Sequence, residues 1–249
     1  MIPLRDNIPT RRPPVVTYVL IAANIAGYFF WQRGGLSLGD PSSAHFICNL
    51  QDWAAIPYEF THPGDQVLIA RGCGVPEAPT WATAFTAMFM HGGLLHLGGN
   101  MLFLWIFGNN VEDSMGSFKF VIFYLLGGLA ALALQTLTGP NSQVPTVGAS
   151  GAIAGVLGGY IVLFPRARVV TVVFIIFFFT ILELPALLVL GLWFLQQALM
   201  GYFDLAQPTG GGGGVAYFAH IGGFVFGLLT IRMFASRKRA ERQARYSRF

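Results

Sequence analysis

Seven apolar segments dominate the chain. They cover residues 15–31, 94–111, 118–137, 147–164, 169–182, 186–202 and 215–234. Most of them approach the roughly 20 residues that a helix needs to cross the hydrocarbon core of a bilayer. A long mixed stretch, residues 34–90, separates the first two segments and is rich in proline. The pattern predicts a polytopic helical membrane protein with one large loop between its first two spans.

The segment at residues 169–182 differs from the others. It is short, it is rich in β-branched residues and phenylalanine, and Glu183-Leu184-Pro185 follows it. Proline and the residue before it usually mark a helix boundary. We therefore expect a half-inserted or interfacial segment here, before the fifth of six membrane-spanning helices. The predicted fold class is all-α.

The distribution of charge agrees with six spans. Basic residues cluster before the first segment and after the last one, and seven crossings would place these clusters on opposite sides of the membrane. Cytoplasmic flanks of membrane spans carry an excess of Lys and Arg. Residues 1–14 and 235–249 are therefore predicted to be cytoplasmic tails, and residues 15–234 a six-span domain. The 34–90 loop then lies on the outer side, and a bacterial cell (inner) membrane is the expected location.

Composition narrows the function further. Hydrophobic residues make up 54% of the 249 residues and charged residues 10%, whereas soluble proteins carry roughly 25% charged residues. A disordered or fibrous chain is excluded. The lipid bilayer, rather than a nucleic acid, is the partner that the net charge of +4 indicates.

Two cysteines, Cys48 and Cys73, lie in the 34–90 loop. An oxidising outer compartment would permit a disulfide between them, and two free thiols fit the sequence equally well. Their spacing matches no paired-thiolate metal motif. The sequence indicates neither a metal site nor a cofactor.

Polar side chains that can carry chemistry occur near the expected outer ends of three spans. They are His96 and Asn100, Ser150, and His220. At a rise of 1.5 Å per residue, all four fall within the outer third of the bilayer. Polar groups are costly in hydrocarbon and therefore indicate function. Their shared depth predicts that they form one site.

A serine and a histidine at the same depth indicate nucleophilic catalysis. Serine needs a general base to become a good nucleophile, and histidine suits that role near neutral pH. His96 and Asn100 are four residues apart and share a helix face. With the backbone N–H of Ser150 at a helix N-terminus, they could stabilise the oxyanion of a tetrahedral intermediate. Each of these residues alone also fits a structural role in helix packing.

Glycines at four-residue spacing explain how the serine and histidine helices could approach closely. Gly151, Gly155 and Gly159 follow Ser150, and Gly223 and Gly227 follow His220. Stripes of small residues allow the backbones of two membrane helices to touch.

At these residues the sequence resembles the rhomboid intramembrane serine proteases. The resemblance is carried by three motifs: His91-x4-His96-x3-Asn100, Gly148-Ala149-Ser150-Gly151, and Ala219-His220 followed by small residues. It covers about residues 79–234. Many members carry an aromatic residue four positions after the serine, where this chain has Ala154.

The resemblance implies a six-helix fold and a serine–histidine dyad. In that reading Ser150 is the nucleophile, His220 is the base, and His96, Asn100 and the Ser150 backbone form the oxyanion site. His91, Gly148 and Gly151 would support the site. The implied activity is cleavage of transmembrane protein substrates at or near the outer membrane face.

Two other functions remain as alternatives. The first is a catalytically inactive rhomboid-like protein that binds membrane clients, a class that lacks the serine or the histidine. The second is a transporter, which would be expected to carry buried charges or an inverted repeat. For the protease, we expect the 203–214 loop to be a lid over the site and the fifth span to be a lateral gate.

Overall fold

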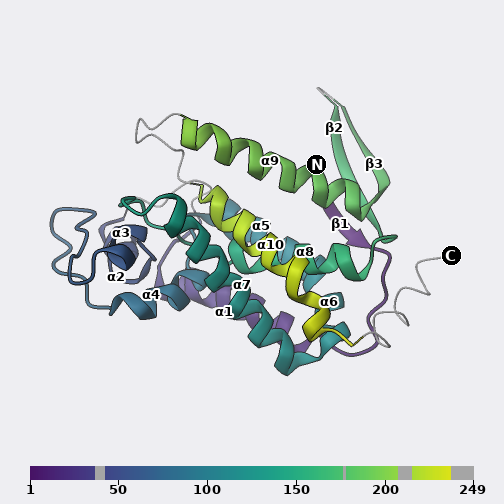
Figure 1. Ribbon diagram of the computed structural model, residues 1–249, viewed down its shortest axis with the longest axis horizontal. Coiled ribbons are helices and arrows are strands. Elements are labelled where there is room, and N and C mark those ends of the chain that lie inside the picture. The colour runs from purple at the N-terminus through teal and green to yellow at the C-terminus, as the bar shows by residue number, and fades with distance from the viewer. Residues whose placement is uncertain (37–42, 176–177, 207–214, 237–249) are drawn as a thin grey trace.

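The computed structural model describes residues 1–36, 43–175, 178–206 and 215–236, and helices dominate it (Figure 1). The helices that cover predicted spans are α1 (Val15–Ala26) with its π-helical extension η1 (Gly27–Trp31), α5 (Leu94–Phe103), η3 (Leu104–Gly108), α6 (Asn109–Met115), α7 (Ser117–Thr138), α8 (Ser150–Leu163), α9 (Ala186–Ala206) and α10 (Tyr217–Phe234). A helix thus forms at each of the six segments that were expected to cross the membrane. Within the described residues, α7, α9 and α10 are long and apolar enough to span a bilayer, and 15–31 and 150–163 form shorter apolar helices.

The segment expected to be half-inserted is a β-hairpin. Strands β2 (Arg168–Ile175) and β3 (Phe178–Pro185) pair antiparallel, and β1 (Ile2–Asp6) pairs with β2 to complete a three-stranded sheet. The fold is mostly helical, but the expectation of an all-α fold is wrong for this sheet, whose strand β1 lies within the predicted tail at residues 1–14. The physical reason is the run of β-branched residues from Val169 to Val173, which favours extended backbone.

The N-terminal segment is anchored to the helices by carboxylates. Asp6 Oδ2 accepts hydrogen bonds from Tyr160 Oη at 2.5 Å and Asn110 Nδ2 at 2.6 Å. Tyr160 lies on α8, ten residues beyond Ser150 and so about 15 Å further along the helix axis. The sheet therefore sits at the end of α8 opposite Ser150, at one end of the molecule in Figure 1.

A second carboxylate holds the start of α1. Glu112 of α6 accepts hydrogen bonds from the backbone N–H groups of Val16 and Thr17, at 3.0 and 2.8 Å. The first N–H groups of a helix have no acceptor within the helix and attract negative charge. Glu112 therefore fixes where the first predicted span begins.

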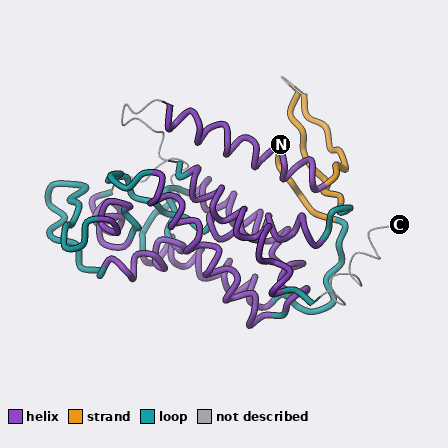
Figure 2. Tube along the Cα trace, in the orientation of Figure 1, coloured by secondary structure: helices purple, strands orange, loops and turns teal. Residues whose placement is uncertain are grey.

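Helices α7, α8 and α10 pack side by side in the centre of the molecule (Figure 2). The predicted glycine stripes lie at the contact between α8 and α10. A Cβ atom on Gly223 would overlap the carbonyl oxygen of Gly151, and one on Gly227 would overlap that of Gly155. The close approach brings the N-terminal ends of α8 and α10, which carry Ser150 and His220, together.

Gly227→Ala is expected to destabilise the protein, because the added methyl meets backbone that cannot rotate away. Overpacking of a well-packed contact costs about 1–3 kcal/mol, which lowers the Tm by several degrees. Gly191→Ala in α9 is the matched control, since its Cβ would have nothing within 4 Å and alanine favours the helix. Thermal unfolding of both purified variants measures the difference. Equal Tm values would contradict the backbone contact between α8 and α10.

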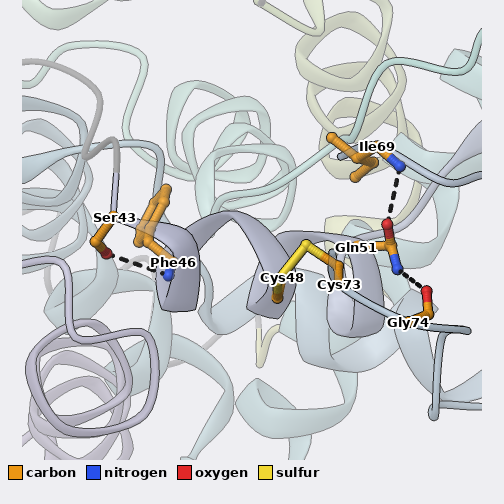
Figure 3. Close-up of a disulfide and its surroundings, with 7 residues drawn as sticks. All are labelled: Ser43, Phe46, Cys48, Gln51, Ile69, Cys73 and Gly74. Atoms are coloured by element: carbon orange, nitrogen blue, oxygen red, sulfur yellow. Dashed lines mark hydrogen bonds between the residues drawn. A yellow bond between two sulfur atoms is a disulfide. The ribbon is translucent and has the colours of Figure 1, made fainter. Parts of the chain in front are cut away.

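The 34–90 loop contains helices and a disulfide. Its helices are α2 (Ala44–Trp53), α3 (Pro57–Thr61), α4 (Thr80–Thr86) and the 3-10 helix η2 (Ala87–Phe89). Cys48 of α2 is bonded to Cys73, so of the two possibilities left open by the sequence the structure has the disulfide (Figure 3). Beside it, Gln51 donates to the Gly74 carbonyl and accepts from the Ile69 N–H, both at 2.9 Å. The described part of the loop thus combines helices and a disulfide at the end of the molecule opposite the sheet (Figure 1).

Candidate active site

Ser150 and His220 lie in contact. The Ser150 Oγ and His220 Nε2 atoms are 2.7 Å apart, which is hydrogen-bond distance. Ser150 is the first residue of α8 and His220 lies in the first turn of α10. The proximity predicted from their shared depth is confirmed. The hydroxyl can donate to Nε2 whenever that nitrogen carries no proton.

The backbone before Ser150 requires glycine at position 148. Gly148 has φ +122°, a conformation that side chains disfavour, and a Cβ there would lie 2.8 Å from His96 Nε2. The Gly148 N–H donates to the Ala87 carbonyl of η2 at 2.9 Å. Two residues earlier, Thr146 pairs with Ala55 in a short antiparallel bridge. The 34–90 loop therefore holds the turn that presents Ser150.

His96 and Asn100 of α5 line the same cavity as Ser150 and His220. This cavity has a volume of about 560 Å³. Asn100 is 8% exposed, and within the described part of the chain its amide nitrogen has no hydrogen-bond acceptor. His96 Nδ1 accepts a hydrogen bond from the Gly92 N–H at 3.3 Å, and this bond restrains the orientation of the His96 ring. The structure thus brings together all four side chains that the sequence assigned to one site.

His91 is buried behind His96. Their rings meet edge to face, with centroids 5.2 Å apart. The His91 backbone exchanges two hydrogen bonds with the Gln32 side chain, at 2.8 and 3.1 Å. Burial, and secondarily the neighbouring imidazole, lower the pKa of His91 to about 3, so its ring stays neutral at physiological pH. These contacts fit the supporting role expected of His91.

Gly151 serves packing, because a Cβ there would lie 2.6 Å from the Ala131 side chain of α7. Ala154, which occupies the position where many family members carry an aromatic residue, is fully buried in the core. An aromatic contact to His220 comes instead from Trp193 of α9, with ring centroids 5.7 Å apart. Trp193 also lines the cavity. The sequence analysis missed this residue.

Gln197 of α9 was also missed. Its Oε1 lies 2.7 Å from His220 Nδ1, the ring nitrogen that faces away from Ser150. The signal was present in the sequence: two adjacent glutamines, Gln196 and Gln197, interrupt the apolar segment 186–202. The rule that polar groups in membrane spans indicate function applies to them as it did to Asn100.

The proposed lid falls largely outside the described residues. Residues 203–206 belong to the last turn of α9, and residues 207–214 are not described. Val215 and Ala216, which follow, line the cavity beside His220.

Comparison with known proteins places the chain in a family. A family model for the Rhomboid domain matches residues 78–237, which is more than half of the chain. The chain belongs to the rhomboid family. The match extends from just before α4 through α10, and it contains every residue that the sequence analysis assigned to the site.

Curated rhomboid relatives come from fungi, plants and bacteria. Rhomboid protein 1, mitochondrial, of Saccharomyces cerevisiae is 33% identical over 145 residues, which are 57% of this chain and 38% of that protein. Rhomboid protease GluP of Bacillus subtilis is 30% identical over 145 residues, 58% of this chain and 24% of GluP. Rhomboid-like protein 11, chloroplastic, of Arabidopsis thaliana is 42% identical over 77 residues, 31% of this chain and 27% of that protein. This chain therefore spans well under half the length of each of these relatives.

Proposed function

We propose that this rhomboid is an intramembrane serine endopeptidase that cleaves transmembrane protein substrates at or near the outer membrane face. The observation that carries the proposal is the 2.7 Å contact between Ser150 Oγ and His220 Nε2 inside a cavity that also holds His96 and Asn100. A nucleophile within hydrogen-bond reach of a base is the geometry that covalent catalysis requires. The printed name of the GluP relative, a rhomboid protease, agrees with this chemistry.

The geometry supports acyl transfer in two stages. His220 Nε2 takes the proton of Ser150 as Oγ attacks the carbonyl carbon of the scissile peptide, and the carbonyl oxygen becomes an oxyanion. His220 then donates that proton to the leaving amine, which gives an ester on Ser150. In the second stage His220 takes a proton from water as the water oxygen attacks the ester carbonyl carbon. The ester C–O bond then breaks, His220 returns the proton to Ser150 Oγ, and the carboxylic acid product leaves.

We assign three donors to the oxyanion. Asn100 is 8% exposed, and its amide nitrogen has no acceptor within the described residues. A substrate oxygen could therefore accept a hydrogen bond from it. His96 lines the cavity on the same face of α5, one turn away. The Ser150 N–H lies in the first turn of α8, where N–H groups lack partners within the helix. Donors fixed before the reaction act most strongly where water is excluded.

The membrane topology that we propose has six crossings over residues 15–234 and both termini on the cytoplasmic side. The sheet and the 34–90 loop lie at opposite ends of the molecule (Figure 1), as this topology requires. Exposed phenylalanines on the hairpin, Phe174, Phe178 and Phe179, suit a position at the lipid interface. The loop with its disulfide would face the outer, oxidising side. We further propose a bacterial cell (inner) membrane as its location; of the relatives named above, Rhomboid protease GluP is bacterial.

Covalent labelling tests the proposed function against the inactive and transporter alternatives. A fluorophosphonate probe is expected to label the purified wild-type protein in detergent, because it captures a serine that is activated by a base. Ser150→Ala should give no labelling, and Ser142→Ala, in the loop between α7 and α8, should be labelled like wild type. Mass spectrometry of the labelled peptide identifies the modified serine. The proposal would be refuted if the wild type were not labelled, or if the label were on a residue other than Ser150.

A further inference from the structure

The second ring nitrogen of His220 faces a buried amide. Gln197 Oε1 lies 2.7 Å from His220 Nδ1, and Gln197 is 6% exposed, although α9 lies on the outside of the helix bundle (Figure 1). The preceding residue, Gln196, is exposed. Two chemically identical side chains on one helix therefore occupy opposite environments, and only the buried one contacts the histidine.

Packing holds the Gln197 amide in place. Trp193, Gln197 and Gly201 are spaced four residues apart, so they share the face of α9 that meets α10. Trp193 contacts the His220 ring, and at Gly201 a Cβ would lie 3.3 Å from the Phe218 ring. Phe194, next to Trp193, stacks on Phe224 with centroids 4.4 Å apart. The amide is thus fixed against His220 by contacts on both sides along the helix.

The chemistry of an amide oxygen at Nδ1 selects one form of the neutral imidazole. An oxygen accepts only from a protonated Nδ1, and neutral histidine then has an unprotonated Nε2. That is the form in which Nε2 can accept the proton of Ser150. An amide N–H at Nδ1 would select the opposite form, which cannot act as a base toward the serine. Leaving the buried oxygen unpaired costs free energy, so the bond is favoured.

We propose that Gln197 is a positioning residue, whose amide oxygen holds the His220 ring in the tautomer and orientation needed to activate Ser150. The inference rests on the proposed serine protease function and assigns to a neutral amide the task that a carboxylate performs in a Ser-His-Asp triad. A neutral group suits this place because a charge buried among apolar helices is costly. Since α9 also supplies Trp193 to the cavity wall, the same helix shapes the substrate cavity and orients the base.

The kinetic test compares three variants. Gln197→Leu removes the acceptor at similar size, Gln197→Glu keeps an acceptor, and Gln196→Leu is the matched control on the exposed face. We expect Gln197→Leu to lower kcat by roughly 10–100-fold, the range found for outer partners that orient metal-bound histidines, with KM little changed. Gln197→Glu should recover most of that loss, and Gln196→Leu should match wild type. Cleavage of a transmembrane substrate in proteoliposomes gives both constants.

A spectroscopic readout makes the test independent of activity. The chain has five histidines, so ¹⁵N-histidine spectra are simple, and the His220 signals are assigned by their loss in His220→Ala. Wild type and Gln197→Glu should show the proton on Nδ1 of His220, and Gln197→Leu should shift the proton toward Nε2. If Gln197→Leu kept both the wild-type kcat and the Nδ1 proton, the proposal would be overturned.

Other outcomes separate the two proposals. Equal losses in Gln197→Leu and Gln197→Glu, with the His220 tautomer unchanged in both, would mean that Gln197 serves packing alone and would also overturn the inference. If the wild type neither reacts with the fluorophosphonate nor cleaves substrate, the proposed function fails. The ¹⁵N spectra would then still decide whether Gln197 sets the tautomer of His220.

Discussion

Ser150→Ala and His220→Ala are each expected to abolish proteolysis, while the protein still inserts and folds. The hydroxyl and the imidazole form one chemical unit at 2.7 Å, and loss of one member of such a unit costs about 10⁴–10⁶-fold in kcat. Because the two act together, the double variant should be no slower than either single variant. The rate of cleavage of a transmembrane substrate in proteoliposomes measures the effect.

The control for this pair is His45→Ala, which removes an exposed histidine of the 34–90 loop. It should keep wild-type activity. Unchanged Tm values for Ser150→Ala and His220→Ala would show that the loss is chemical rather than structural. Wild-type turnover by either variant would refute the proposed mechanism.

The helices at the apolar runs of this rhomboid could be predicted from sequence, whereas the strand β1 could not. Apolar runs such as 118–137 are long enough to specify a helix by themselves, and α7 covers that run. The strand β1 has no such local signal. It exists because Ile2 and Pro3 find partners in β2, about 170 residues away in the chain, and because Tyr160 and Asn110 donate to Asp6. Pairing over that distance depends on the folded arrangement, which a window of sequence does not contain.

The candidate site shows a similar division. Ser150, His220, His96 and Asn100 were found because each is a polar residue at the same depth in an apolar span, and the structure brings them together. Gln197 is just as polar, but its role depends on which face of α9 meets α10. Gln196 and Gln197 differ by one residue, about 100° of helical rotation, and only the packing of α9 decides which one is buried.

The contribution of the 34–90 loop is also a property of the folded chain. Its disulfide and helices are local, but its effect on the site comes through the Ala87 carbonyl and the bridge at Ala55, which hold the residues before Ser150. The loop that looked like a connection between spans therefore stabilises the Gly148 turn. At that turn, a Cβ atom on Gly148 would lie 2.8 Å from His96 Nε2 and 3.4 Å from Ser150 Oγ, so both side chains border Gly148.

The oxyanion donor gives the second large effect. Asn100→Ala is expected to lower kcat by roughly 10²–10³-fold, the loss seen when one fixed donor to a developing oxyanion is removed. The Asn100 residue is 8% exposed, lines the cavity, and its amide nitrogen has no acceptor among the described residues, so a substrate oxygen can accept from it. Because that bond strengthens as charge develops in the transition state, kcat should fall while KM stays nearly constant.

The magnitude distinguishes a donor from a structural amide. Asn109→Ala is the control, since Asn109 begins α6 nine residues further along the same helical stretch, about 13 Å away. It should retain wild-type kcat. Donation from His96 and the Ser150 backbone continues in Asn100→Ala, so residual turnover should exceed that of Ser150→Ala. A rise in KM with kcat intact would instead mean that Asn100 binds substrate equally in the ground and transition states, and the oxyanion assignment would fall.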